Sequence, residues 1–95
     1  MPIRVGILEV TLVLAEGDSL KDKRRVVKGL IETTRRKFNV AVSEVDHLDI
    51  WRKATLGIVT VSNSGTFCNK VLDTVLDHLE SYPEFEVASV SMDID

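Results

Sequence analysis

The sequence predicts an α+β protein with a ferredoxin-like fold, in which a four-stranded antiparallel sheet carries two helices on one face. Two observations support this class. Segments with apolar residues at alternate positions and two longer segments with apolar residues every three or four positions follow each other in the order β-α-β-β-α-β. Each helical segment has a single apolar face, so both helices are expected to cover the same side of one sheet.

Length and composition predict a single domain spanning residues 1–95. Apolar residues make up 44% and charged residues 28%, proportions typical of a globular protein. Cys68 is the single cysteine, which excludes an intrachain disulfide and a thiolate metal cage, so folding depends on packing.

The first half of the chain is predicted to form a strand, a helix and a second strand. Ile3–Leu14 has apolar residues on both alternating faces, which is typical of a central strand. Ser19 and Asp22 have the spacing of a helix N-cap, so a helix is expected over about Leu20–Lys37. The apolar period changes to two over Phe38–Asp46, which predicts the second strand.

The second half is predicted to form a strand, a helix and a final strand. The third strand, at about Trp51–Ser62, is expected to form a hairpin with the second. A cap at Asn63-Ser64-Gly65 precedes a helical run that ends at Tyr82-Pro83. Alternation in Glu84–Ile94 changes phase, which predicts a fourth strand with either a β-bulge near Ala88 or a slip of register.

The sheet face away from the helices is predicted to be unusually apolar. Such a face is seldom left in water, so it indicates an interface in a homo-oligomer such as a dimer, or a surface for a ligand or partner. The residues expected on it are Ile7, Thr11, Val13, Ala41, Val45, Val59 and Val61.

Charge is distributed unevenly along the chain. The net charge is −3, but residues 21–38 hold eight basic and two acidic side chains, whereas residues 54–95 hold one basic and seven acidic ones. On a helical wheel the basic residues of the first helix form a cationic stripe about 20 Å long, suited to the phosphates of a nucleic-acid backbone. The stripe comprises Lys21, Arg24, Arg25, Lys28, Arg35 and Arg36.

The start of this helix breaks a local preference, because four cations stand where the helix dipole is positive, at a cost of roughly 0.3–1 kcal/mol each. Such violations are typical of functional sites, and free N–H groups with cations favour an anion such as phosphate. The four cations are Lys21, Lys23, Arg24 and Arg25, and the N-cap residue Ser19 is expected to belong to the same anion site. Two structural alternatives stay open: Glu32 pairs with three cations of the stripe on a solvated face, or Lys23 extends over the edge of the core.

Other reactive side chains are few. Asp46, His47 and Asp49 lie together in the connector between the second and third strands, where such residues hold a divalent ion less often than they cap a turn. Cys68 and His78 are expected to be structural. No nucleophile turn or phosphate-binding glycine loop is present, so no catalytic residue, metal or cofactor is predicted and the protein is expected not to be an enzyme.

The aromatic residues do not match those of the RNA-recognition modules that share this fold. Those modules stack bases on aromatic side chains of the central strands, and this chain has none there. Nucleic acid is therefore expected to contact the first helix. Trp51, beside Arg52 and Lys53, either packs at the end of the hairpin or stacks on a base or partner.

A set of short motifs is spread over the chain: Ser19-Leu20-Lys21 with Lys23-Arg24, Phe38-Asn39-Val40, Glu44-Val45-Asp46-His47 with Asp49 and Trp51, and Ser81-Tyr82-Pro83-Glu84. From Val5 to about Glu86 the chain thereby resembles the YlxP-like family of small uncharacterised bacterial proteins. The resemblance implies a ferredoxin-like fold and a gene that often lies near those for translation initiation and ribosome maturation factors. It thus favours contact with RNA or the ribosome through the basic helix.

Three hypotheses for function follow. The first is an accessory protein that binds ribosomal RNA or a ribosomal subunit on one side only, because the second half of the chain is acidic. The second is a metabolite sensor that binds a small ligand at the turn Ala15–Ser19, beside a dimer interface. The third is a structural homo-oligomer whose basic helix docks on an acidic partner or on its own acidic second helix.

The expected location is the cytoplasm. The start of the chain lacks the apolar block of a signal peptide, and its longest uncharged stretch, Ala54–Asn69, contains polar residues and glycines. No membrane partner is therefore predicted.

Overall fold

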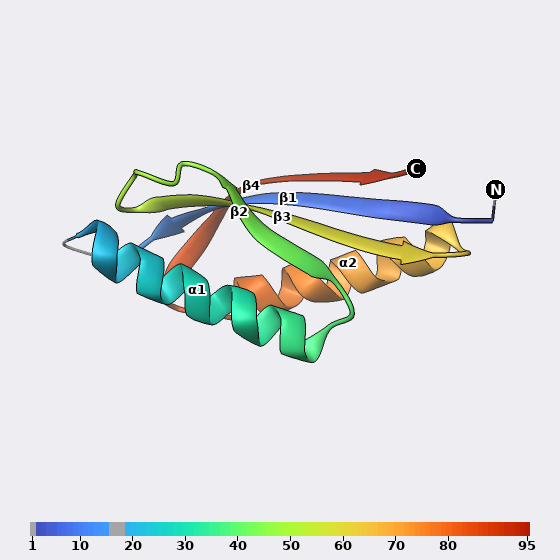
Figure 1. The fold of residues 1–95 in the computed structure, drawn as a ribbon, viewed down its shortest axis with the longest axis horizontal. Helices are drawn as coiled ribbons and strands as arrows, with labels where there is room; N and C mark the ends of the chain where they lie inside the picture. Colours follow the sequence, from blue (N-terminus) through green and yellow to red (C-terminus); the bar gives the residue numbers. More distant parts are fainter. Residues whose placement is uncertain (1, 16–18) are drawn as a thin grey trace.

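The computed structural model describes residues 2–15 and 19–95 (Figure 1). The order of its elements is β-α-β-β-α-β, which confirms the predicted fold class. The elements are β1 (Arg4–Leu14), α1 (Leu20–Lys37), β2 (Ala41–Asp46), β3 (Lys53–Ser62), α2 (Gly65–Glu80) and β4 (Phe85–Ile94).

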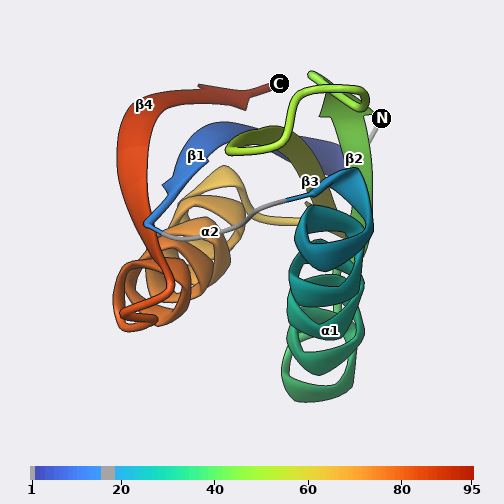
Figure 2. The ribbon, with the colours of Figure 1, turned by 90° about the vertical axis from the view of Figure 1, so that its left-hand side faces the viewer.

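The four strands form one antiparallel sheet in the order β2-β3-β1-β4. Both helices lie on the same side of this sheet and are offset from each other, with α1 below β2 and α2 below β1, β3 and β4 (Figures 1 and 2). This offset gives an elongated molecule of 47 × 20 × 19 Å. As a result, α1 lies at one edge of the protein.

Both helices begin at the caps that the sequence predicts. The hydroxyl of Ser19 accepts a hydrogen bond from Asp22 N at 3.1 Å, and that of Ser64 accepts one from Phe67 N at 3.2 Å. Each bond satisfies a backbone N–H that has no partner within the helix. The helix α1 ends where Phe38 adopts an extended backbone, with φ −128° and ψ 149°.

The bulge predicted in the last strand is confirmed. Along β4 the partners in β1 change register between Thr11, which faces Ser89, and Leu12, which faces Val87, so Ala88 is the extra residue. This bulge, rather than a slip of register, explains the change of phase.

A second bulge, in β2, is not evident from the sequence. Glu44 faces Leu56 and Asp46 faces Thr55, so Val45 is the extra residue. The side chain of Val45 lies over Gly57, where an added Cβ would be 3.0 Å from its Cγ1. Glycine at this position therefore leaves room for the bulge.

The starts of all four strands differ from the predicted ones. β1 and β4 each begin one residue later than predicted. β2 begins at Ala41 instead of Phe38, because Phe38 ends α1 and its carbonyl accepts a hydrogen bond from Val40 N at 3.0 Å in a tight turn. β3 begins at Lys53 instead of Trp51, because residues 47–52 form the connecting loop, called the β2–β3 loop below.

The core lies between the sheet and the helices. The alternating residues of β1 that were predicted to share one face are buried there, together with β3 residues and one stripe from each helix. Cys68 is fully buried among them and behaves as the small apolar residue that the sequence predicts. The main buried side chains are Leu8, Val10, Leu12, Leu14, Ala54, Leu56, Ile58, Val27, Leu30, Leu72, Val75 and Leu79.

Candidate nucleic-acid interface

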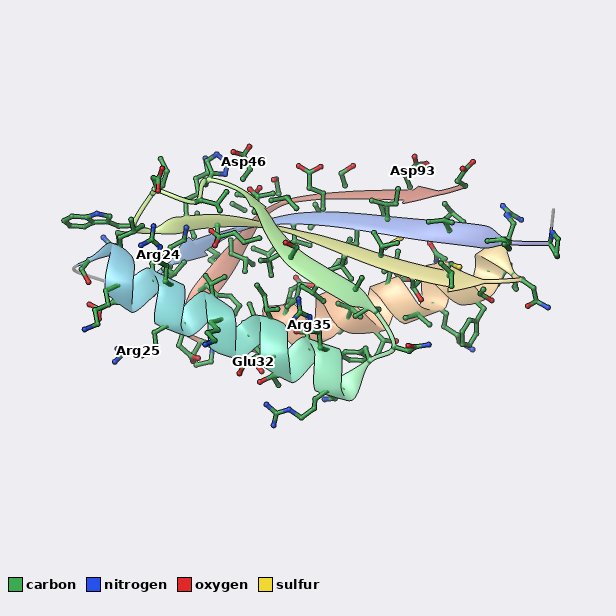
Figure 3. All side chains as sticks on the ribbon, viewed as in Figure 1. Arg24, Arg25, Glu32, Arg35, Asp46 and Asp93 are labelled. Carbon is green, nitrogen blue, oxygen red and sulfur yellow. The ribbon has the colours of Figure 1, made fainter. Side chains whose placement is uncertain are left out.

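The six residues of the cationic stripe are all exposed on α1. The opposite side of the helix buries Val27, Leu30 and Thr34, so the apolar stripe fixes which side chains reach solvent. Figure 3 shows that the exposed side chains spread around the helix: Arg24 and Arg35 are directed toward the sheet, and Arg25 and Glu32 point away from it. The stripe is therefore broader than a single line of charges.

Glu32 does not neutralise the stripe. Within residues 2–15 and 19–95, its carboxylate forms no ion pair, and neither do Lys28 and Arg36. Arg25 Nη2 lies 3.5 Å from Asp22 Oδ1, an exposed contact of a kind that contributes about 0–1 kcal/mol. Most of the positive charge on α1 is thus available to an anion.

Arg35 differs from the other cations of the stripe. Its Nη2 donates a hydrogen bond of 2.8 Å to the carbonyl oxygen of Val42 in β2. The guanidinium therefore helps to hold α1 against the edge of the sheet, and this contact competes with binding an anion.

Lys23 is not part of the exposed surface. Its side chain is fully buried, and its Nζ donates hydrogen bonds to the carbonyl oxygens of His47 at 2.8 Å and Leu48 at 3.2 Å. Nζ also lies 2.5 Å from Glu44 Oε2, which has no other hydrogen-bond partner among the described residues. Its selection as a phosphate ligand is therefore wrong, because burial hides its charge. The helical wheel, which places Lys23 toward the apolar side, gives the signal for this outcome.

These contacts join the start of α1 to the β2–β3 loop. The loop begins at His47, whose φ of 62° lies in the left-handed region. Its N–H donates to Asp46 Oδ1 at 2.7 Å, and its Nδ1 lies 2.8 Å from Thr55 Oγ1. Thr55 Oγ1 lies 2.9 Å from Thr11 Oγ1. The loop therefore turns back over the open face of the sheet and is fixed there (Figure 1).

The same contacts explain the acidic and histidine cluster of the connector. Asp46 caps the His47 N–H, His47 contacts a threonine, and Asp49 Oδ1 lies 3.6 Å from Arg24 Nη2. In the part of the chain that the structure describes, no three His, Cys, Asp or Glu side chains come together as a metal site. Turn and ion-pair contacts account for all three residues.

In addition to Asp49, the β2–β3 loop exposes large apolar side chains, and it lies next to the start of α1. Leu48 and Ile50 are about half exposed, and Trp51 is 53% exposed. About half of Trp51 is therefore available to a partner. Leu48 and Ile50 were not selected from the sequence, because two apolar residues in a short connector have no periodic pattern that marks them as exposed.

Comparison with known sequences gives the family. Residues 5–92 match the model of a family described as a protein of unknown function, DUF503. The chain belongs to the DUF503 family. It is also 37% identical over 82 residues to the protein named Uncharacterized protein YlxP from Bacillus subtilis (strain 168), an alignment that covers 86% of this chain and 89% of that protein. The resemblance drawn from short motifs is thereby confirmed.

The open face of the sheet in this DUF503 chain presents the apolar residues that the sequence predicts. Ile7, Val13, Val45 and Val61 are exposed large apolar side chains on this face. Ala41 is also exposed, and Thr11 and Val59 are partly buried. Because the helices lie on the other side of the sheet, this surface is separate from the cationic stripe (Figure 2).

His78 of the DUF503 chain lies in a row of rings that joins the two helices to β4. Its ring centroid is 5.3 Å from that of Phe38 and 5.2 Å from that of Tyr82, and Tyr82 stacks on Phe85 at 5.4 Å. Burial, and secondly the charge of Lys37, lower the pKa of His78 below its usual value. These contacts are those of a structural residue.

Two further predictions for the DUF503 chain concern a ligand and a membrane. The turn proposed for a small ligand, Ala15–Ser19, includes residues 16–18, which lie outside the described residues. Among the described residues, no helix is both long and apolar enough to cross a bilayer.

Proposed function

We propose that this DUF503 protein is a non-enzymatic, cytoplasmic accessory protein that binds the phosphates of ribosomal RNA, free or within a ribosomal subunit, through α1. The observation that carries the proposal is the exposed cationic stripe on an edge helix of a chain whose net charge is −3. Uneven charge of this kind orients a protein toward a polyanion. The acidic β4 lies at the sheet edge opposite to β2, the strand that α1 packs against.

The exposed cations of the stripe that make no hydrogen bond to the backbone define the phosphate-binding surface. They are Lys21, Arg24, Arg25, Lys28 and Arg36. Their partners within the described residues are limited to the exposed carboxylates of Asp22 and Asp49. Exposed pairs of this type exchange for phosphate at little cost, because each contributes about 0–1 kcal/mol.

The open face of the sheet supports a homo-oligomer, such as a dimer, as part of the same proposal. A two-fold interface buries the same patch on both subunits, and this face offers exposed apolar side chains to a second copy, with Glu9 and Asp93 among them. Because α1 lies on the opposite side of the sheet, a dimer formed in this way would leave both cationic stripes exposed (Figure 2). The variant Val61→Glu should then lower the solution mass to that of one chain, measured by analytical ultracentrifugation. An unchanged mass would remove this face from the interface.

The experiment that tests RNA binding is co-sedimentation with ribosomal subunits and with free ribosomal RNA at low salt. The triple variant Arg24→Glu, Arg25→Glu, Lys28→Glu should abolish retention and leave the melting temperature nearly unchanged, because all three side chains are exposed. Two single variants make the same change of charge at different places on the surface. Lys28→Glu on α1 should weaken retention, whereas Lys70→Glu, at an exposed lysine of α2, should not. Equal retention of the triple variant and the unaltered protein would refute the proposal.

A further inference from the structure

We propose that the β2–β3 loop is the base-binding part of the same surface, and that Trp51 stacks on an unpaired base of a single-stranded RNA whose phosphates lie on α1. This inference rests on the proposed function and adds the class of RNA to it. It assigns a role to the exposed apolar side chains that the cationic stripe leaves unexplained.

The loop and the stripe are adjacent. Asp49 of the loop lies 3.6 Å from Arg24 of α1, and Trp51 follows Asp49 by two residues, which limits the separation of their Cα atoms to about 7 Å. Lys23 adds two hydrogen bonds between the helix and the first residues of the loop. An RNA strand on the first turns of α1 therefore passes within reach of the indole.

The loop is held in place before any ligand binds. The buried Nζ of Lys23 fixes one side of it, and the contact of His47 with Thr55 fixes the other. At its end, Arg52 donates a hydrogen bond to the carbonyl of Ala15, and its own carbonyl accepts one from Leu14 N at 2.8 Å. A side chain on a fixed loop loses little freedom on binding, which favours stacking.

The stacking partner is an unpaired base because an exposed indole needs an exposed ring face. Bases in a duplex are already stacked on one another. Unpaired bases stack on aromatic residues with a favourable free energy that depends little on the nucleotide sequence. The cations of α1 follow a strand along the helix, and the indole takes one base at its end. This arrangement of a cationic track with an aromatic platform is typical of single-strand binding.

An anionic membrane fits the loop less well. Asp49 stands between Leu48 and Ile50 with 89% of its side chain exposed, so a carboxylate would enter the headgroup region together with the apolar residues. Arg36, near the far end of α1, is remote from the loop and would not reach a flat surface that the loop touches, whereas a strand can follow the helix to it. The observations therefore favour RNA, and vesicles serve as a competing probe.

Trp51 is the only tryptophan of the chain, so its fluorescence reports on this loop alone. We would titrate the full chain with a mixed-sequence single-stranded RNA of about twelve nucleotides, with the duplex of the same sequence, and with anionic phospholipid vesicles. Stacking predicts quenching by the single strand and little change with the duplex. A blue shift with vesicles in the absence of RNA quenching would overturn the inference in favour of a membrane surface.

Variants separate stacking from phosphate binding. With labelled single-stranded RNA, Trp51→Ala should weaken binding by about 5-fold to 150-fold, and Trp51→Phe should restore most of the affinity. Phe67→Ala is the matched control, since Phe67 is also 53% exposed but lies in the first turn of α2, and it should have no effect. If Trp51→Ala binds as the unaltered protein does while the triple charge reversal abolishes binding, the base-stacking inference is wrong and the proposed function stands. If the unaltered protein binds no RNA, both are wrong.

Discussion

The substitution Lys23→Met tests how the candidate site is built. Methionine keeps the unbranched apolar part of the side chain but removes the ammonium group, so the buried volume changes little. Glu44 Oε2 then loses its one polar contact, and the carbonyls of His47 and Leu48 lose a charged donor. Lys23 is fully buried and the Glu44 side chain is only 14% exposed, so water replaces little of what is lost.

The expected cost follows from these contacts. Removing one member of a buried ion pair destabilises a protein by about 3–5 kcal/mol, and the slight exposure of Glu44 places this case near 3 kcal/mol. For a domain of this size, a loss of about 3 kcal/mol lowers the melting temperature by about 12–24 °C. Urea denaturation followed by circular dichroism measures the free energy of unfolding directly.

A double variant distinguishes the ion pair from simple packing. Lys23→Met together with Glu44→Gln should recover part of the lost stability, because the uncompensated carboxylate is gone. Trp51 fluorescence should shift to the red in Lys23→Met alone if the ammonium group fixes the β2–β3 loop. A free energy of unfolding within about 1 kcal/mol of the unaltered protein, with unchanged fluorescence, would refute this account of the loop.

Three further predictions concern Asp49, His78 and two glycines. Asp49→Asn should raise the affinity for single-stranded RNA several-fold in a binding titration, since it removes a carboxylate that competes for Arg24; no gain would show that this pair does not compete with phosphate. The pKa of His78 is lowered in the folded state, so its contribution to stability is complete above about pH 6.5 and is lost as the pH falls through that value toward the folded pKa. His78→Phe should flatten that part of the curve of unfolding free energy against pH, and an unchanged slope would contradict the assignment. Gly29→Ala should stabilise α1 by about 0.5–1 kcal/mol, since its Cβ meets nothing within 4 Å, whereas Gly6→Ala should destabilise by about 1–3 kcal/mol, since its Cβ would lie 2.9 Å from a leucine of α2. Urea denaturation of both glycine variants measures the sign of each change in the free energy of unfolding.

Local signals were sufficient to predict the helices. Ser19 and Ser64 each cap a helix with a backbone contact three residues away, so the start of each helix is encoded within four residues. The bulge at Ala88 was predictable for the same reason, because a change in the phase of alternation appears within one strand.

Tertiary contacts limit what the sequence reveals about the site. The β2–β3 loop is shaped by Lys23 from another element and by the contact of His47 with Thr55. The local pattern around Trp51 shows neither contact, so the sequence predicts that the third strand begins at Trp51, whereas β3 begins at Lys53. The bulge at Val45 depends on space above Gly57 in the neighbouring strand. The exposed cations were predictable, since amphipathic spacing alone determines which side of α1 reaches solvent.

Charge composition alone would have given a misleading picture of the surface. Residues 21–38 have eight basic side chains, but Lys23 is internal and Arg35 holds the edge of β2. Both serve the packing of α1, and part of the unfavourable charge at its start is thereby explained without a ligand. The remaining exposed cations of the stripe form the proposed phosphate-binding surface.

The salt dependence of single-stranded RNA binding tests the central claim most directly. With the five cations of the phosphate-binding surface each meeting a phosphate, the logarithm of the association constant should fall with the logarithm of salt concentration along a slope of about −3.5, a loss of about a hundredfold between 50 and 200 mM. The slope should become shallower by about 0.7 in Lys28→Glu and stay unchanged in Lys70→Glu. Binding that does not respond to salt, or no binding at low salt, would contradict the assignment of α1 as an RNA-phosphate surface.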